Sequence, residues 1–282
     1  MSTIQSFSAK REESELERVF LAGKSRFKGS DDGAWVLNNG GGVQMRQRAD
    51  EFPPVLVGLI LANVGVFLAW QYAAKGLSLR AIEWDKFLCR HFRSSWLHLR
   101  GGLFHTPVTS AFSHSGFMHL AFNMYALYMF APPIIRIIGE SEFLAFYLLA
   151  CAVSGLGDSA AALLYRSEWR WVATKLPSLG ASGAVFGIIG MSMVLFPDKR
   201  YSLMFVPVYF RLDQLGWALA GFDVLGYLWK LINGPAAGMS IAHMAHFSGF
   251  IFGYAYTHTY LSRLPQVKQR LEYNKRMKQI GM

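Results

Sequence analysis

The stretch "PSLGASGAVFGIIG", residues 177–190, decides the fold. It is apolar, yet Ser182 stands between Gly180 and Gly183, and Gly187 and Gly190 follow on the same segment. Glycine in a helix costs roughly 1 kcal/mol relative to alanine, so this density of glycine requires a structural reason. We interpret the stretch as a membrane helix that approaches another helix closely and carries the Ser182 hydroxyl.

The distribution of charge is that of a membrane protein. Of the 282 residues, 52% are hydrophobic and 16% are charged, whereas average globular chains have about 25% charged residues. Asp, Glu, Lys and Arg are absent from residues 52–74, 101–135, 176–197 and 231–262. Each stretch can cross a hydrocarbon core, which needs about 20 helical residues. A soluble enzyme with a very apolar core is the alternative.

Two further apolar stretches contain one acid each, Asp158 in residues 143–165 and Asp223 in residues 214–229. With them, the sequence predicts an all-α membrane protein with six transmembrane helices. The expected spans are residues 53–74, 106–138, 141–165, 180–196, 214–230 and 240–262. The expected domains are a polar N-terminal tail (1–51), a six-span domain (52–262) and a basic C-terminal tail (263–282).

The net charge of +10 has two interpretations, nucleic-acid binding and basic loops beside anionic lipid headgroups. Six spans place both tails on one side of the membrane, and that side holds 18 of the 28 Lys and Arg residues. Such a bias is typical of membrane topology. We therefore expect the lipid bilayer, and no nucleic acid, as a partner.

The segment between the first two spans, residues 75–104, alternates aromatic and basic residues. Its aromatic residues include Trp84, Phe87, Phe92 and Trp96. A segment of this kind can lie in the headgroup layer, with its aromatic side chains toward the lipid and its cations toward water. We expect a semi-submerged first loop, and a plain surface loop is the alternative.

Polar side chains at membrane depth are costly, so each of them is a candidate for function. The candidates are His114, His119 and Asn123 in the second span, Ser182 in the fourth, and His243 and His246 in the sixth. His119 and Asn123 are four residues apart and therefore share one helix face. His243 could face the same water-filled cavity as His246, and Asp158 is expected to form a structural hydrogen bond or to face water.

The glycines suggest how Ser182 and His246 could meet. Gly183 and Gly187 form one small-xxx-small pattern, and Gly249 and Gly253 form another. Such patterns let two membrane helices approach backbone to backbone. If these two faces meet, the serine and the histidine come within hydrogen-bond reach.

These residue types fit nucleophilic catalysis. A serine needs a base to act as a nucleophile at neutral pH, and imidazole is the usual base. An oxyanion needs preorganised donors, which the Ser182 amide, His119 and Asn123 can supply. These motifs contain no triad acid; Asp223 could be a third member, but we expect it instead to bond a neighbouring helix.

Four histidines among these candidates also permit a metal-site interpretation, because imidazole is a common zinc ligand. A zinc site leaves Ser182 and the oxyanion donors without a role. We therefore expect neither a metal nor a cofactor.

The chain resembles the rhomboid intramembrane serine proteases in three motifs, which have the family's order and lie in the expected spans. The motifs are "HSGFMHLAFN" (114–123), "LGASGAVFG" (179–187) and "AHFSGFIFG" (245–253). The resemblance covers about residues 53–262 and implies a six-span core with a semi-submerged loop. It implies Ser182 as nucleophile, His246 as general base, and oxyanion donors at His119, Asn123 and the Ser182 amide. It also implies supporting roles for His114, Gly180, Gly183, Phe186 and Gly249, with Phe186 stacked on the histidine.

Within that family, "TSAFSHSGFMHLAFNMYAL" (109–127) and "GFDVLGY" (221–227) are similar to the mitochondrial presenilin-associated rhomboid-like branch. The resemblance implies the inner mitochondrial membrane and substrates that are single-span membrane proteins. Two other functions remain open for this sequence. One is an inactive rhomboid-like protein that binds and escorts membrane helices, although the chain retains both Ser182 and His246. The other is a transporter, although the sequence has no recognisable inverted repeat.

Overall fold

The computed structural model describes residues 35–37, 43–45, 52–76, 78–202, 208–239 and 241–279. The chain divides into two units, residues 1–51 and 52–282, and each is described by itself. In the first unit, strand β1 (Trp35–Leu37) pairs antiparallel with strand β2 (Val43–Met45). The rest of the predicted polar tail lies outside the described residues.

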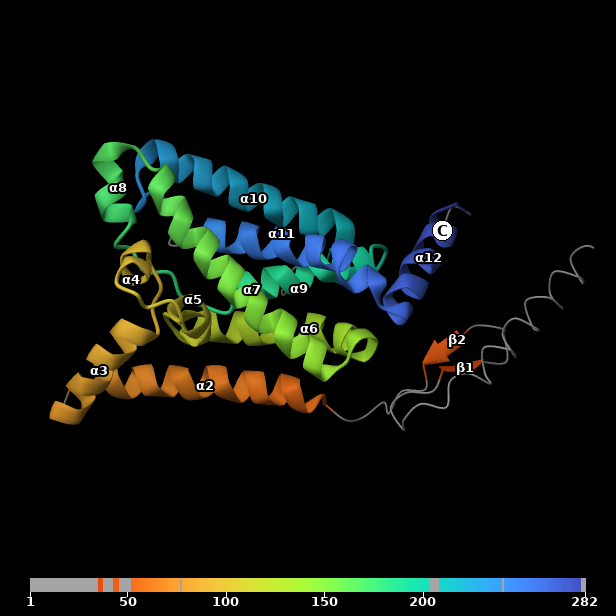
Figure 1. The fold of residues 1–282 in the computed structure, drawn as a ribbon, viewed down its shortest axis with the longest axis horizontal. Coiled ribbons are helices and arrows are strands. Elements are labelled where there is room, and N and C mark those ends of the chain that lie inside the picture. Colours follow the sequence, from red (N-terminus) through yellow and green to blue (C-terminus); the bar gives the residue numbers. More distant parts are fainter. Residues whose placement is uncertain are drawn as a thin grey trace, which may run out of the picture. The chain divides into compact units, whose positions relative to one another are not determined.

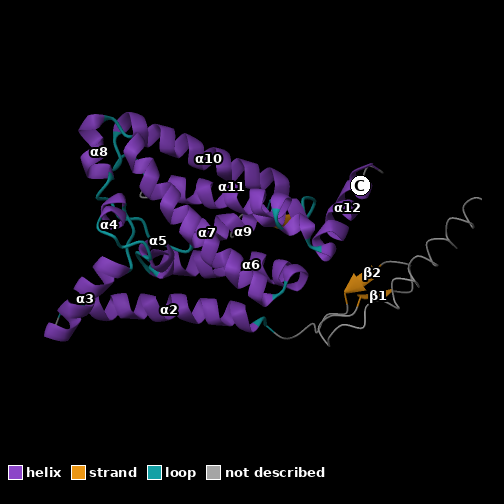
Figure 2. Cartoon of the chain, viewed as in Figure 1, coloured by secondary structure: helices purple, strands orange, loops and turns teal. Residues whose placement is uncertain are grey.

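Long helices dominate the second unit, as Figures 1 and 2 show. They are α2 (Pro54–Ala74), α6 (Phe117–Ile138), α7 (Glu140–Ala161), α9 (Ser182–Leu195), α10 (Leu212–Asn233) and α11 (His243–Thr259). Among the described residues, four stretches are long and apolar enough to cross a membrane: α2, α6, α10, and α7 with the short helix η2 (Ala162–Leu164). Helix α9 has 14 residues, which is about 21 Å of helix, whereas a hydrocarbon core is about 30 Å thick.

Helix α9 lies inside the bundle. It contacts α6, α7, α10 and α11, and nearly every residue from Gly183 to Leu195 is buried. A helix that is apolar all round is stable when other helices surround it. The segment that carries Ser182 is therefore enclosed by protein.

Helices α9 and α11 touch through their backbones. A Cβ atom added to Gly249 would overlap the carbonyl oxygen of Gly183, and one added to Gly253 would overlap that of Gly187. The two predicted glycine faces therefore do meet. The backbones are so close that only the hydrogen side chain of glycine fits between them.

The second span begins later than expected. Residues 106–112 form helix α5 (Thr106–Thr109) and a 3₁₀ turn, η1 (Ser110–Phe112), and α6 begins only at Phe117. Pro107 packs closely on α7, where a Cβ atom on Gly155 would lie 2.8 Å from its Cα. The expected range 106–138 does hold the second span, but its long helix occupies only Phe117–Ile138, and the first residues cover protein as separate short turns.

The remaining elements are short and connect the long helices. They are α3 (Leu79–His91), α4 (Trp96–Arg100), α8 (Ser167–Ala173), the antiparallel strands β3 (Arg200–Ser202) and β4 (Tyr209–Arg211), and the 3₁₀ turn η3 (Leu261–Arg263). Helix α3 buries Ala81 and Leu88 and exposes Trp84 and Phe87, so the first loop is amphipathic.

The basic C-terminal segment contains a helix, α12 (Pro265–Gln279), that packs against α9 and α6. Arg270 Nε donates to the Leu195 carbonyl oxygen at 2.8 Å. Asn274 Nδ2 donates to the carbonyl oxygens of Val194 (3.2 Å) and Leu195 (3.0 Å). These carbonyls belong to the last turn of α9, where intrahelical partners are lacking. Helix α12 therefore caps α9.

We predict that Gly253→Ala destabilises the protein by about 1–3 kcal/mol, because the added methyl group forces α9 and α11 apart. Gly65→Ala in α2 is the matched control, since its Cβ atom would meet nothing within 4 Å and alanine favours a helix. Thermal unfolding of the detergent-solubilised variants measures both changes. Equal stability of the two variants would contradict backbone contact between α9 and α11.

Candidate active site

Ser182 begins α9, so its backbone N–H is one of those without a partner inside the helix. The preceding segment is fixed by backbone hydrogen bonds. Ser178 and Ser94 exchange two of them, at 2.7 and 3.1 Å, and the Gly180 N–H donates to the Ser110 carbonyl at 3.0 Å. Gly180 has φ of +120°, a conformation that favours glycine. The first loop and α5–η1 thereby hold the serine in place.

The serine meets a histidine from α11. Ser182 Oγ lies 2.8 Å from His246 Nε2, which is hydrogen-bonding distance. The imidazole ring of His246 stacks on Phe186, with ring centroids 4.2 Å apart and planes 12° apart. Phe186 lies one turn after Ser182 on α9, so one helix supplies both the hydroxyl and the surface that supports the ring.

Asp223 on α10 contacts the other side of His246. Asp223 Oδ1 lies 3.2 Å from His246 Nδ1 and 2.8 Å from His243 Nδ1. A carboxylate accepts and cannot donate, so each Nδ1 carries a proton, and His246 Nε2 is left free to accept one from Ser182. Asp223 does bond a neighbouring helix, as predicted, but its partner includes the histidine that faces the serine. The motif analysis missed this link.

His119 and Asn123 on α6 flank the serine. The Ser115 N–H donates to His119 Nδ1 at 3.4 Å, which leaves His119 Nε2 as the protonated ring nitrogen. That nitrogen faces the chain at Gly180, where an added Cβ atom would lie 2.9 Å from it. Asn123 Nδ2 donates to the His119 carbonyl at 2.8 Å, and among the described residues its second N–H has no further acceptor.

His114 lies in the segment just before α6 and is buried. Its ring packs edge-on against His119, with centroids 5.0 Å apart. Burial and the neighbouring His119 lower the pKa of His114 to about 4. The ring therefore contacts His119 as a neutral imidazole at neutral pH.

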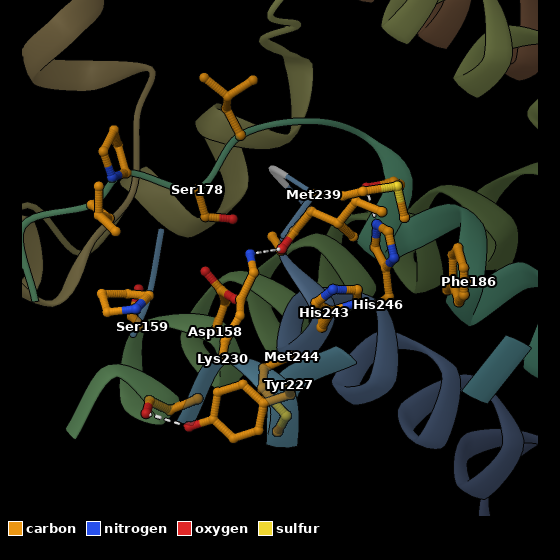
Figure 3. Close-up of a pocket in the computed structure, with 18 of the residues that line it drawn as sticks. Asp158, Ser159, Ser178, Phe186, Tyr227, Lys230, Met239, His243, Met244 and His246 are labelled. Atoms are coloured by element: carbon orange, nitrogen blue, oxygen red, sulfur yellow. Dashed lines mark hydrogen bonds between the residues drawn. The ribbon is translucent and has the colours of Figure 1, made fainter. Parts of the chain in front are cut away.

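A cavity of about 860 Å³ joins these groups. Ser182, His246, His119, Asn123 and Phe186 line one part of it. Figure 3 shows this cavity with Asp158, Ser178, Tyr227, Lys230 and His243 among its labelled lining residues, together with His246 and Phe186. Asp158 and His243 thus both face the cavity, in agreement with their predicted placement.

Lys230 lines this cavity. Its Nζ donates to the Ile241 carbonyl oxygen at 2.8 Å, linking the end of α10 to the start of α11. Within the part of the chain that the structure describes, no three His, Cys, Asp or Glu side chains are grouped so that they could hold a metal ion.

This arrangement resembles what acyl transfer requires. It offers a hydroxyl bonded to an imidazole that a carboxylate orients, beside N–H donors at a helix start and on a facing helix. His243 and Asp223 are the two residues of this arrangement to which the motifs assigned no part.

Comparison with known proteins agrees with the motifs. Residues 102–263 match the model of the Rhomboid domain family. The human presenilin-associated rhomboid-like protein, mitochondrial, is 30% identical over 206 residues, which cover 71% of this chain and 47% of that protein. RHOMBOID-like protein 12, mitochondrial, of Arabidopsis thaliana is 33% identical over 207 residues (69% and 55%).

Rhomboid protein 1, mitochondrial, of Saccharomyces cerevisiae is 30% identical over 202 residues, which cover 72% of this chain and 52% of that protein. The chain therefore spans about half the length of the curated relatives it matches.

We predict that Gly180→Ala slows the reaction of Ser182 with a fluorophosphonate, a reagent for activated serines, by at least about tenfold. The new Cβ atom would lie 2.7 Å from His119 Cε1, so the histidine must move. Gly102→Ala is the matched control, because Gly102 also has a positive φ (+79°) but open space around it. A wild-type labelling rate in Gly180→Ala would contradict the prediction, and equal slowing in both variants would indicate backbone strain, and not displacement of His119, as the cause.

Proposed function

The chain belongs to the rhomboid family, and from this premise we propose that it is an intramembrane serine endopeptidase. Ser182 is the nucleophile and His246 is the general base. The observation that carries this proposal is the 2.8 Å contact between Ser182 Oγ and His246 Nε2 inside a shared cavity. A serine in this contact can lose its proton as it attacks a carbonyl carbon.

The reaction proceeds in two steps. In the first, Ser182 Oγ attacks the peptide carbonyl and passes its proton to His246 Nε2. The protonated imidazole then gives this proton to the leaving amine, and an acyl-enzyme forms. In the second, water attacks the ester, again with His246 as base, and the acid product and free Ser182 result. Asp223 stabilises the imidazolium and fixes the His246 tautomer. No metal or cofactor takes part.

The negative oxygen of each tetrahedral intermediate is stabilised by three donors. The Ser182 amide lies at the start of α9, and His119 Nε2–H and the free N–H of Asn123 come from α6. Donors fixed before the reaction stabilise a developing charge without having to reorganise. In this assignment His114 supports His119, and Phe186 supports His246.

The glycines of the site permit these approaches. Gly180 leaves room for the His119 ring, and Gly183 and Gly249 let α9 and α11 touch, which brings Ser182 to His246. They therefore act on the reaction by placing the reacting groups.

We further propose six membrane spans, the four long apolar stretches together with the shorter helices α9 and α11. Residues 52–262 then hold the six spans of the protease domain, and helix α12 of the C-terminal segment packs on them. The first loop lies half-submerged in the headgroup layer, with the exposed Trp84 and Phe87 of α3 toward the lipid. Helix α9, which is shorter than the membrane is thick, places Ser182 below the membrane surface but within reach of water in the cavity.

The substrates in this proposal are single-span membrane proteins. A peptide bond in a regular helix is shielded by its hydrogen bonds, so cleavage is expected where small or helix-breaking residues loosen the substrate helix. The mitochondrial names of the matched relatives support the inner mitochondrial membrane as the location.

A fluorophosphonate tests the nucleophile and the base directly. We predict that it labels Ser182 in the wild type and labels neither Ser182→Ala nor His246→Ala, because the hydroxyl needs its base. Ser192→Ala is the control on the same helix, since Ser192 Oγ is buried without a partner among the described residues. Absence of label from a folded, monodisperse wild type, with a known rhomboid protease as positive control, would favour a helix-binding protein without catalytic activity.

We predict that His119→Ala and Asn123→Ala each lower kcat at least about tenfold on a single-span substrate, because loss of one oxyanion donor costs about 3 kcal/mol. Asn233→Ala is the control for the asparagine, since Asn233 makes the same bond to the carbonyl four residues earlier, Trp229, on an exposed helix end. Unchanged kcat in either site variant would remove that residue from the oxyanion site.

A further inference from the structure

We propose that His243 is a positioning residue for the proposed reaction, which acts on His246 through the carboxylate of Asp223. The inference rests on the proposed function, and it extends the site to a second imidazole that touches neither Ser182 nor the reacting atoms. Figure 3 shows His243 and His246 at the start of α11, with Phe186 beside His246.

The two imidazoles share one oxygen atom. Asp223 Oδ1 accepts from His243 Nδ1 at 2.8 Å and from His246 Nδ1 at 3.2 Å, so the bond to His243 is the shorter. The histidines are three residues apart and therefore share a helix face toward α10. The position of this oxygen depends on His243 at least as much as on His246.

His243 is itself held in place by α10. A Cβ atom on Gly226 would overlap its imidazole ring, so the ring lies directly against bare backbone. Phe222 packs edge-on against it, with ring centroids 5.6 Å apart. Phe222 and Gly226 stand on either side of Asp223 in the sequence, so the same turn of α10 fixes both the carboxylate and its second donor.

The carboxylate needs this second donor because of its surroundings. Asp223 is fully buried, and its Oδ2 has no hydrogen-bond partner among the described residues. A buried carboxylate is stable in its charged form only when enough donors compensate for lost water. Without His243, the bond to His246 at 3.2 Å would be its remaining link in the described structure. The carboxylate would then be free to turn away from His246.

This movement would impair His246 as a base. The bond from Asp223 keeps the proton of neutral His246 on Nδ1 and leaves Nε2 free for Ser182. A freed ring can hold its proton on Nε2 instead, and that tautomer cannot accept from the serine. His243 therefore acts on the fraction of His246 that is ready to react, which affects kcat rather than substrate binding.

Two amide substitutions separate this role from a packing role. The amide nitrogen of Asn can take the place of Nδ1 and that of Gln the place of Nε2, since the side chains differ by one methylene. We predict that His243→Ala and His243→Gln lower kcat about tenfold or more, with KM within about twofold. His243→Asn retains most of the wild-type kcat. His258→Ala is the control, because His258 is an exposed histidine on the same helix.

A double-mutant cycle then tests whether His243 acts through Asp223. If it does, His243→Ala has no further effect on kcat in the Asp223→Ala background, because the link is already broken. Additive losses of kcat would overturn the proposal, and so would equal kcat in the His243→Asn and His243→Gln variants. A change in KM without a change in kcat would also overturn it, because it would indicate a direct contact of His243 with substrate.

The closing experiment does not depend on proteolysis. Two-bond ¹⁵N–¹H correlation spectra of ¹⁵N-histidine-labelled protein in detergent report the tautomer of each ring. We expect Nδ1–H for His246 in the wild type and in His243→Asn, and a mixture or Nε2–H in His243→Ala. An unchanged His246 tautomer in His243→Ala would overturn the positioning role even in an active enzyme. If the spectra are as expected but the wild type is not labelled by the fluorophosphonate, the proposed function is overturned and the positioning role of His243 is not.

Discussion

The site depends on the backbone contact between α9 and α11. Each helix carries one half of the Ser–His pair, and the glycines that let the backbones touch are close in sequence, one residue after Ser182 and three after His246. A side chain larger than hydrogen would separate the helices by more than a hydrogen bond tolerates. In a membrane, burial of apolar surface contributes little to helix association, so close packing has to hold the helices together. The same packing here also determines the distance between Ser182 and His246.

Much of this fold could be predicted from the sequence because charge is excluded from the bilayer. The charge-free stretches located α2 and α11 within a few residues, and the apolar stretch around Asp223 located α10. The same signal failed at residues 106–112, because hydropathy does not distinguish an apolar turn covering α7 from one facing lipid. It also failed at α12, whose composition is that of a solvated tail. There the attachment comes from the Arg270 and Asn274 side chains and leaves no periodic pattern.

The site could be predicted in part for a related reason. Ser182, His119 and His246 stand out because polar groups are rare in membrane helices, and their placement along the spans brings them together. Asp223 stands out equally, yet its partner could not be identified, because it lies 23 residues before His246 on another helix. Only the rotation of α10 against α11, which side-chain packing determines, directs the carboxylate to the two imidazoles.

The attachment of α12 to α9 has a consequence for where this domain ends. The family match stops at residue 263, but Arg270 and Asn274 supply donors to carbonyls at the far end of the helix that begins with Ser182. The folding unit therefore extends about one helix beyond the recognisable domain. Helix α12 has the composition of a solvated tail, yet it caps the helix that carries Ser182. The folded domain therefore ends later in the chain than the family match does.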